Sequence, residues 1–360
     1  MPREITCNQF FDGDILHGPC RIVITDDGLV ESIDVHIGEF EFELISPGYV
    51  DLQMNGFDNV HVASASTEDL LRLDETLVEH GTTSWLGTIV TAPLDKMSAS
   101  LVSLHESFQS QQVHGFSGIH VEGPFLGNAP GAHPVTHIIA CDLHWISRLV
   151  PSVRLVTVAP EQTDVIPAIR AMKDQNITVS LGHSRPSKTQ FEEAVKAGAS
   201  MVTHLFNGMS GVHHREPGLA MWALNDERIS CGLIADGVHV QSDALALAFR
   251  AAGSRICLVS DSVAWKTSSG PRPGIEIRDG APRLLDGTLA GSCTPLAECV
   301  QRVVRDCGVS LGSALASATS IPADLVGLKD VGRITVGKKA DLLALDSELS
   351  VLKAWRRLPS

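Results

Sequence analysis

The chain has 360 residues, of which 44% are apolar and 19% are charged, a balance typical of a globular protein with a sizeable core. Its formal charge of −14 argues against a surface that binds nucleic acid or anionic membranes, although a small anionic substrate needs only one local cation. No apolar run approaches the roughly 20 residues of a membrane span, and the first residues lack a signal-peptide pattern. The eight cysteines form no CxxC pair, so we expect reduced thiols and a cytoplasmic protein.

The two ends of the chain read differently from its middle. Residues 1–46 contain short strand patterns separated by turn signals, and residues 331–360 have the same character. Two β-rich ends around one central region would most simply pair with each other. We therefore expect one small β-sandwich domain formed by the N- and C-terminal segments, and a larger domain formed by residues 47–330.

Within the central region, eight apolar strand patterns alternate with amphipathic helical segments. The strands are expected at residues 49–54, 82–90, 115–122, 153–159, 177–183, 201–206, 229–236 and 256–261. Such an alternation indicates a parallel sheet covered by helices, and eight units in about 215 residues fit an α/β fold of the (β/α)8 TIM-barrel type. Residues 294–327 look helical and would complete the outer ring. A doubly wound sheet is the alternative, but no GxGxxG turn follows an early strand.

Polar side chains stand where several of these strands end. The third strand ends in Glu122, the fifth in His183, the sixth near His204 and the eighth in Asp261. The carboxyl ends of barrel strands meet at one rim, which is where such folds place their active sites. One carboxylate and two imidazoles are the ligand set of a catalytic zinc site with an open position, so we predict that Glu122, His183 and His204 hold a metal. Asp261, across the rim, would transfer protons.

Each of these residues also has a purely structural explanation. Glu122 could accept backbone N–H bonds from the loop at Gly123, and either histidine alone could be a hydrogen-bonded core residue. Asp261 precedes Ser262 and could cap a helix. The coincidence of four such residues at four strand ends favours the metal site.

Several motifs occur in an order that resembles the N-acetylglucosamine-6-phosphate deacetylases of the amidohydrolase superfamily. These motifs are PGYVDLQMNG, HVEGPF, GHS, THLFN, REPGL, ADGVHV, LVSDS and TLAGS, followed by GRITVGKKADLLALD, which resembles the C-terminal β segment of many amidohydrolases. The resemblance implies hydrolysis of the acetamide of N-acetyl-D-glucosamine 6-phosphate to D-glucosamine 6-phosphate and acetate. It also implies one divalent metal ion per subunit, zinc in the first place, with iron, cobalt or manganese as alternatives.

The resemblance assigns a role to each matching residue. It makes Glu122, His183 and His204 the metal ligands and Asp261 the catalytic acid and base, and it places His133 beside the reacting amide. The implied substrate contacts are Ala132, His133, Asn207, Gly208, Arg215, His239, Leu289, Ala290 and Gly291. Arg215 is expected to bind the phosphate from the neighbouring subunit of a homodimer, although a solvated surface arginine is its structural alternative.

The sequence departs from its relatives at two places on the rim. Many amidohydrolases have HxH on the first strand and bind two metals, whereas this chain has Gln53 and Asn55, which are poor replacements for imidazole and argue for one metal. The segment 261–274 contains Trp265 and Lys266 where relatives have small residues. The substrate could therefore be another acetamido sugar phosphate, such as N-acetylgalactosamine 6-phosphate, or a different amide. A metal- or sugar-phosphate-binding protein without catalysis is the remaining alternative.

Overall fold

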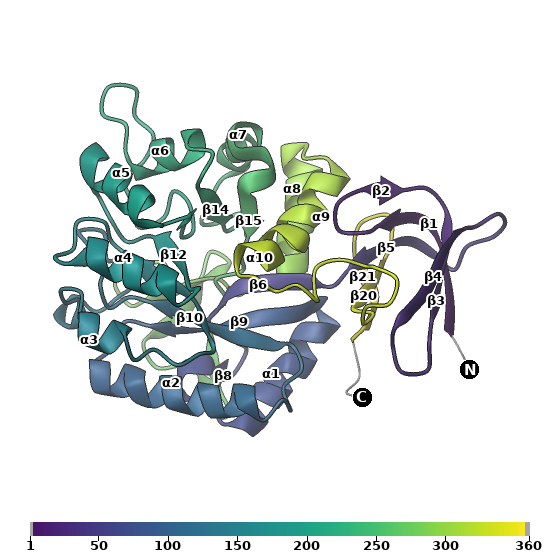
Figure 1. Cartoon of the computed structure of the whole chain (residues 1–360), viewed down its shortest axis with the longest axis horizontal. Coiled ribbons are helices and arrows are strands. Elements are labelled where there is room, and N and C mark those ends of the chain that lie inside the picture. The colour runs from purple at the N-terminus through teal and green to yellow at the C-terminus, as the bar shows by residue number, and fades with distance from the viewer. Residues whose placement is uncertain (1–2, 357–360) are drawn as a thin grey trace.

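The computed structural model of the protein describes residues 3–356 and contains two large β-sheets, with helices around the larger one (Figure 1). The larger sheet has eight parallel strands, which pair in chain order. They are β6 (Tyr49–Met54), β9 (Thr82–Val90), β10 (Phe116–Glu122), β11 (Val153–Val158), β12 (Thr178–Leu181), β13 (Met201–Val202), β14 (Ser230–Leu233) and β15 (Ile256–Leu258). A parallel bridge between Met54 and Ser262 joins the first strand to the chain that follows the last. The predicted (β/α)8 barrel is confirmed.

The four strands β12 to β15 are clearly shorter than the sequence suggests. For three of them, the reason lies in the residues that follow. The strands β12, β13 and β15 end before His183, His204 and Asp261, which have φ angles of 49°, 29° and 48°. Each of these residues is thus in the left-handed region, which non-glycine residues rarely adopt and which ends an extended strand. The polar residues of the rim lie on these turns rather than on the strands themselves.

Helices surround the barrel, most of them on its outside (Figure 1). They are α1 (Thr67–Glu79), α2 (Leu94–Gln109), α3 (Leu143–Ile146), α4 (Val165–Asp174), α5 (Lys188–Ala197), α6 (Leu219–Asn225), α7 (Ser242–Ala252), α8 (Leu296–Cys307), α9 (Leu311–Ser317) and α10 (Ser320–Leu325), with 3-10 turns at Val62–Ser64, Val135–His137 and Gly253–Arg255. Ser66 and Ser187 begin α1 and α5 with capping boxes, in which the serine and the third helical residue satisfy each other's backbone N–H. None of the helices between residues 3 and 356 is long and apolar enough to cross a membrane.

The last helix departs from the predicted outer ring. Ile321 and Leu325 of α10 pack against an apolar cluster inside the barrel, which includes Val50, Leu86 and Leu155. The Leu325 carbonyl also accepts a hydrogen bond from the Thr178 hydroxyl at the start of β12. The helix α10 therefore closes the amino end of the barrel, and the carboxyl end of the strands stays open for an active site.

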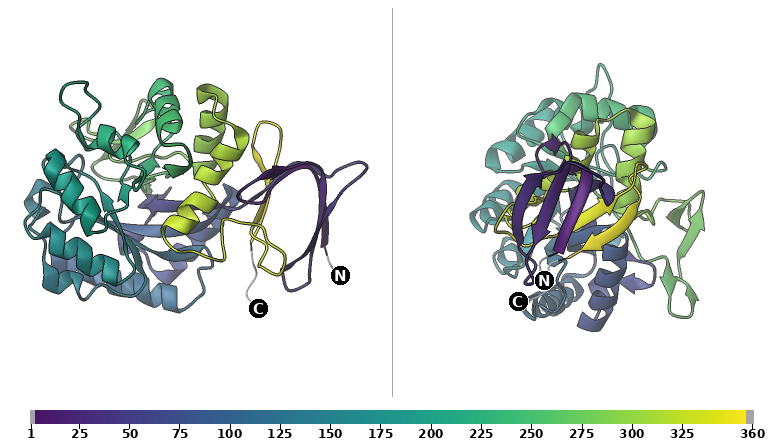
Figure 2. Two further views of the ribbon diagram at one scale, coloured as in Figure 1. Left: turned by 45° about the horizontal axis from the view of Figure 1, so that its top comes forward. Right: turned by 90° about the vertical axis from the view of Figure 1, so that its right-hand side faces the viewer.

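The two ends of the chain meet in the second sheet, as predicted. Its strand order is β21-β20-β5-β1-β3-β4, with β2 paired to β1. These strands are β1 (Arg3–Phe11), β2 (Leu16–His17), β3 (Cys20–Ile24), β4 (Val30–Val35), β5 (Phe42–Pro47), β20 (Leu342–Leu345) and β21 (Val351–Trp355). Figure 2 shows the first strands in purple and the last in yellow, side by side at one end of the molecule. The domain limits at 46/47 and 330/331 stay a prediction.

Short hairpins extend from the carboxyl end of the barrel. They are β7 (Gly56–Phe57) with β8 (Val60–His61), β16 (Lys266–Thr267) with β17 (Gly270–Pro271), and β18 (Ile275–Arg278) with β19 (Ala281–Leu284). The backbone N–H groups of Trp265 and Lys266 both donate to the Asp58 carbonyl, which ties the second hairpin to the first. These hairpins supply part of the wall around the rim.

Candidate active site

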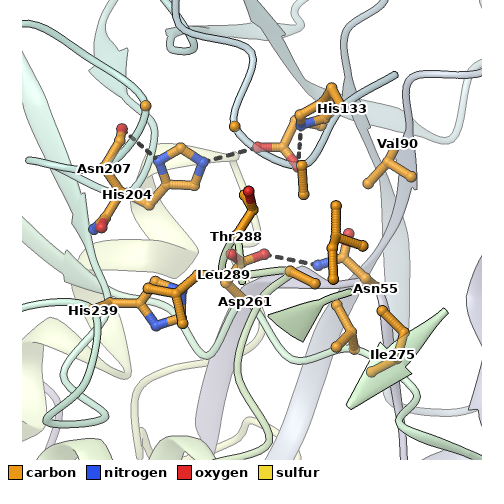
Figure 3. A pocket seen from close by; sticks show the side chains of 18 of the residues that line it. Asn55, Val90, His133, His204, Asn207, His239, Asp261, Ile275, Thr288 and Leu289 are labelled. Carbon is orange, nitrogen blue, oxygen red and sulfur yellow. Dashed lines mark hydrogen bonds and ion pairs between the residues drawn. The ribbon is translucent and has the colours of Figure 1, made fainter. Parts of the chain in front are cut away.

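A cavity of about 330 Å³ opens at the carboxyl ends of the barrel strands (Figure 3). It is lined by every residue that the sequence assigned to the site except Arg215. Those lining residues are Glu122, Ala132, His133, His183, His204, Asn207, Gly208, His239, Asp261, Leu289, Ala290 and Gly291. The fold thus brings together residues that are up to 169 positions apart in the chain, Glu122 and Gly291, as a barrel rim requires.

Glu122, His183 and His204 meet at one point of this cavity. The Oε1 atom of Glu122 lies 3.2 Å from the Nε2 atoms of both His183 and His204. The two Nε2 atoms are 3.1 Å from each other. Ligands of a tetrahedral ion with bonds of about 2.0 Å are separated by about 3.3 Å, so the spacing of these three atoms fits a bound cation.

The Nδ1 atoms of His183 and His204 form hydrogen bonds that determine how the two rings face Glu122. Nδ1 of His183 lies 3.1 Å from the Ala129 carbonyl, and Nδ1 of His204 lies 3.2 Å from the Asn207 carbonyl. A carbonyl only accepts, so each Nδ1 carries a proton, and a ring that holds no second proton directs the lone pair of Nε2 at the carboxylate. Glu122 Oε1 and the two Nε2 atoms therefore face one another with their lone pairs, and a positive charge between them removes the electrostatic repulsion.

The pKa shifts of Glu122 and His204 also favour a positive charge between these side chains. Burial works against the charged carboxylate, but the neighbouring His183 and His204 imidazoles hold the pKa of Glu122 well below its usual range. Burial also works against a charged imidazole, yet the Glu122 carboxylate outweighs this effect and raises the pKa of His204. The site keeps Glu122 ionised and favours a positive charge beside it, either a proton or a metal ion.

His133 belongs to the same cluster. Its Nε2 atom is 3.1 Å from Nε2 of His183 and 3.8 Å from Oε2 of Glu122, and the donor atoms of Glu122, His133 and His183 all lie within 4.8 Å of one another. Nδ1 of His133 lies 2.8 Å from the Thr91 hydroxyl oxygen. Burial and the neighbouring His183 lower the pKa of His133 to about 3, so its ring is neutral at physiological pH. His133 can thus serve either as a metal ligand or as a polar contact for the substrate.

Asp261 stands across the cavity from this cluster. Its Oδ1 atom accepts hydrogen bonds from Asn55 Nδ2 at 2.8 Å and from Gln53 Nε2 at 3.0 Å. The Gln53 amide also donates to Glu122 Oε1 at 3.1 Å. Burial and the negative charge of Glu122 raise the pKa of Asp261 to about 7, close to the range in which a group both accepts and returns protons. Gln53 and Asn55, which the sequence marked only as poor metal ligands, are the amides that hold this carboxylate.

The comparison with known families agrees with this site. Residues 44–358 match the model of the Amidohydrolase family. The chain belongs to the amidohydrolase family. It is 34% identical over 344 residues to the N-acetylgalactosamine-6-phosphate deacetylase of Escherichia coli O157:H7, covering 91% of this chain and 90% of that protein. It is 32% identical over 370 residues to the N-acetylglucosamine-6-phosphate deacetylase of Danio rerio, covering 96% and 89% of the two chains.

Solved structures of this enzyme class have the same fold. A mutant N-acetyl-D-glucosamine-6-phosphate deacetylase from Mycobacterium smegmatis, in complex with N-acetyl-D-glucosamine-6-phosphate, superimposes with a TM-score of 0.92 at 27% identity, covering 99% and 98% of the two chains. The N-acetylglucosamine-6-phosphate deacetylase from Thermotoga maritima superimposes with a TM-score of 0.91 at 27% identity, with the same coverage. The resemblance that the motifs indicate is confirmed.

One wall of the amidohydrolase pocket consists of Asn207, Gly208 and His239. Gly208 has a φ of 55°, and a Cβ atom on it would lie 2.8 Å from Nδ1 of His183, so only glycine fits beside this ring. His239 Nδ1 lies 2.7 Å from Asp236 Oδ2, while Asp236 Oδ1 accepts from the backbone N–H of His239 at 2.8 Å. Asp236 therefore shapes the turn and also orients the His239 ring.

Arg215 does not line the pocket of its own chain. It lies on the exposed loop 210–216, where the backbone N–H of Glu216 donates to His213 Nδ1 at 3.1 Å. The expectation that Arg215 serves a neighbouring subunit stays a prediction, because the structure contains one chain.

The pocket also contains residues that the sequence did not single out. His61, Val90, Arg272, Ile275 and Thr288 all contribute to its wall. Of these, only Arg272 carried a signal that could have been noticed, since it is a cation in a Gly- and Pro-containing segment shortly after Asp261 in a strongly acidic chain. The others carry no local signal, because His61 and Ile275 reach the pocket through the folding of the hairpins and Val90 through the end of β9.

Proposed function

We propose that this amidohydrolase hydrolyses the acetamide of N-acetyl-D-glucosamine 6-phosphate to D-glucosamine 6-phosphate and acetate, in the cytoplasmic breakdown of amino sugars. The observation that carries the proposal is that the cluster of Glu122, His183 and His204 faces Asp261 within one pocket. Relatives with this activity in their names, 32–35% identical over most of the chain, support it. N-acetylgalactosamine 6-phosphate is the second candidate substrate, because a relative named for it is equally similar.

One divalent metal ion, zinc in the first place, would be held by Glu122, His183 and His204. Such an ion brings the pKa of its water to about 7 and polarises the amide carbonyl. The chain itself supplies proton transfer, since Asp261 is positioned to accept a proton from the attacking water and to deliver it to the departing nitrogen. His133, held by Thr91, would contact the carbonyl oxygen as negative charge develops on it.

The remaining residues would bind the sugar phosphate. Asn207, Gly208 and His239 line one wall, and Arg215 from the partner in a homodimer would contribute a planar guanidinium for the phosphate. Backbone groups of Leu289–Gly291 and of Ala132 would hold the sugar ring. Binding energy from the phosphate, remote from the broken bond, positions the amide between Asp261 and the metal ligands.

The test is acetate release by purified, metal-analysed protein. N-acetylglucosamine 6-phosphate, its galacto epimer and both unphosphorylated sugars are compared at equal concentration. We expect turnover that depends on the phosphate, with about one metal per chain as in other open zinc sites. Metal-loaded protein that releases acetate from none of the four would refute the deacetylase proposal, and a preference for the galacto epimer would select the second candidate.

A further inference from the structure

Arg272 is a cation at the edge of the active-site pocket. It lines the pocket together with Asp261 and Ile275, yet within residues 3–356 its guanidinium has no hydrogen-bond or ion-pair partner. Neighbouring cations are neutralised, because Lys266 Nζ lies 2.7 Å from Asp58 Oδ1 and Arg72 pairs with Asp69. In a protein with a formal charge of −14, an unneutralised half-buried arginine in a pocket is a candidate for binding an anion.

The backbone around Arg272 is well anchored. Its N–H donates to the Trp265 carbonyl at 3.1 Å, and its carbonyl accepts from the N–H of Ile275 at 3.1 Å. The Trp265 ring packs edge-on against Phe57, with ring centroids 4.9 Å apart. The guanidinium is therefore presented from a segment that is tied to the barrel, which reduces the entropy lost when it binds a ligand.

Arg272 lies on the side of the pocket opposite to the proposed phosphate wall. Its neighbour His61 donates from Nδ1 to the Asn55 carbonyl at 3.3 Å. Figure 3 shows Asn55 and Ile275 on one side of Asp261, and Asn207 and His239 on the other. A substrate whose phosphate contacts Asn207 and His239 would thus direct its far side toward Arg272.

There is additional room beyond Arg272. A second cavity of about 570 Å³ shares His61 and Arg272 with the active-site pocket and is lined mainly by polar residues, including Thr267 and Ser268. Burial and the charge of Arg272 lower the pKa of His61 to about 4, so Arg272 carries the positive charge at this junction. An acetyl group or a sugar hydroxyl neither fills this space nor neutralises this charge.

We propose that Arg272 forms a second anion-binding subsite, and that the enzyme acts on acetamido sugar phosphates carrying a further acidic group on the amide side of the sugar. The guanidinium fork suits a carboxylate or a phosphate, which it can contact through two parallel N–H bonds. The acid would be borne either by a ring oxygen next to the amide or by the acyl group itself. This inference rests on the proposed deacetylase function.

The experiment compares three substrates with the metal-loaded enzyme. They are N-acetylglucosamine 6-phosphate, its 3-O-carboxyethyl ether, and the N-succinyl amide of glucosamine 6-phosphate, in which hydrolysis releases succinate instead of acetate. We expect the wild type to prefer at least one of the two carboxylate-bearing compounds over the parent. In Arg272→Gln, that preference in kcat/KM should fall roughly tenfold or more, the usual effect of losing a charge-assisted bond.

Two controls complete the design. Arg278→Gln removes an exposed arginine of β18 that does not line the pocket, and it should leave the preference unchanged. Arg272→Lys keeps the charge without the fork and should restore part of the preference. The compound whose preference depends on Arg272 identifies the carrier of the acid, ring oxygen or acyl group.

Binding measurements separate this inference from the proposed function. Calorimetry with both carboxylate-bearing compounds reports the subsite even if no acetate is released from the parent. Weaker binding of either compound to Arg272→Gln than to Arg278→Gln would support the subsite without turnover. Equal preferences and equal binding in wild type and Arg272→Gln, for both compounds, would overturn it.

Discussion

Two aspartates on the barrel have raised pKa values and different surroundings: Asp51 is fully buried, whereas Asp261 is half-buried at the pocket. Burial raises the pKa of Asp51 to about 6 and that of Asp261 to about 7, because neither carboxylate reaches bulk water. Asp51 Oδ1 accepts backbone N–H bonds from Gln53 and Ser260 and so joins the first strand to the last. Asp261 instead faces the pocket. We therefore expect Asp51 to affect stability and Asp261 to affect catalysis.

For Asp261, we predict that Asp261→Asn retains metal and substrate binding and loses turnover. The amide keeps the size of the side chain but accepts no proton at neutral pH, so kcat should fall about a hundredfold or more. Metal content, substrate affinity and kcat are measured on the same preparation. Near-normal kcat with full metal content would remove Asp261 from the reaction.

For Asp51, we predict a pH-dependent stability difference between the wild type and Asp51→Asn. The pKa of about 6 in the folded protein exceeds the ordinary value of 3.8, so the folded state binds more protons between these pH values. The stability that Asp51 contributes is therefore present at low pH and lost as pH rises to 6 and above. The shift corresponds to roughly 3 kcal/mol, fully expressed between pH 4 and 7.

Urea unfolding of both proteins at pH 4, 5, 6 and 7 checks this. The free energy of unfolding of the wild type, relative to Asp51→Asn, should decrease as the pH rises. Other titrating groups are common to both proteins and cancel in the difference. Two pH curves that run parallel would show that Asp51 does not titrate in this range.

At the scale of elements, the presence of the strands was predictable, whereas the points where they end and the turns that follow were not. The eight strand patterns are visible in the sequence because strands buried on both faces are nearly continuous apolar runs. The left-handed residues His183 and His204 were read as parts of strands, since no local signal marks a positive φ at a histidine. The tertiary structure imposes these turns, and they direct both imidazoles toward Glu122.

The turn after β13 yields a prediction for Gly208. In Gly208→Ala, the new methyl group would collide with His183 Nδ1 and disturb its hydrogen bond to the Ala129 carbonyl. Because that bond orients a proposed metal ligand, we expect metal affinity to fall about tenfold or more. Gly211→Ala is the matched control in the same loop, because nothing lies within 4 Å of its Cβ position. Equal metal affinity in both variants would contradict the proposed role of His183.

At the scale of the whole molecule, Arg215 lies apart from the pocket of its own chain. It is exposed and absent from the pocket of its own chain, while all other predicted site residues line that pocket. If a neighbouring chain receives it, one subunit completes the site of another. This expectation comes from the family resemblance of the sequence. It concerns the contact between two subunits and not the fold of one chain.

We predict that mixed oligomers of Arg215→Ala and Asp261→Asn chains regain activity that neither variant has alone. In a mixed dimer with trans contacts, one pocket contains an intact Asp261 and receives an intact Arg215. With cis contacts, no pocket has both residues. The variants are denatured together, refolded with metal, and assayed on phosphorylated substrate. Activity no greater than the average of the two parent variants would exclude the trans arrangement.

The sequence by itself determined the barrel, the pairing of the two ends, and the strand-end residues of the candidate site. It could do so because apolar periodicity reports burial directly, and because strand ends of a parallel barrel converge whatever their spacing along the chain. Only the tertiary structure decided that Gln53 bridges Glu122 and Asp261, that α10 closes the barrel, and that Arg272 at the pocket edge has no hydrogen-bond or ion-pair partner for its guanidinium among residues 3–356. These features depend on distances between residues far apart in the chain, and no local pattern of residues encodes such distances.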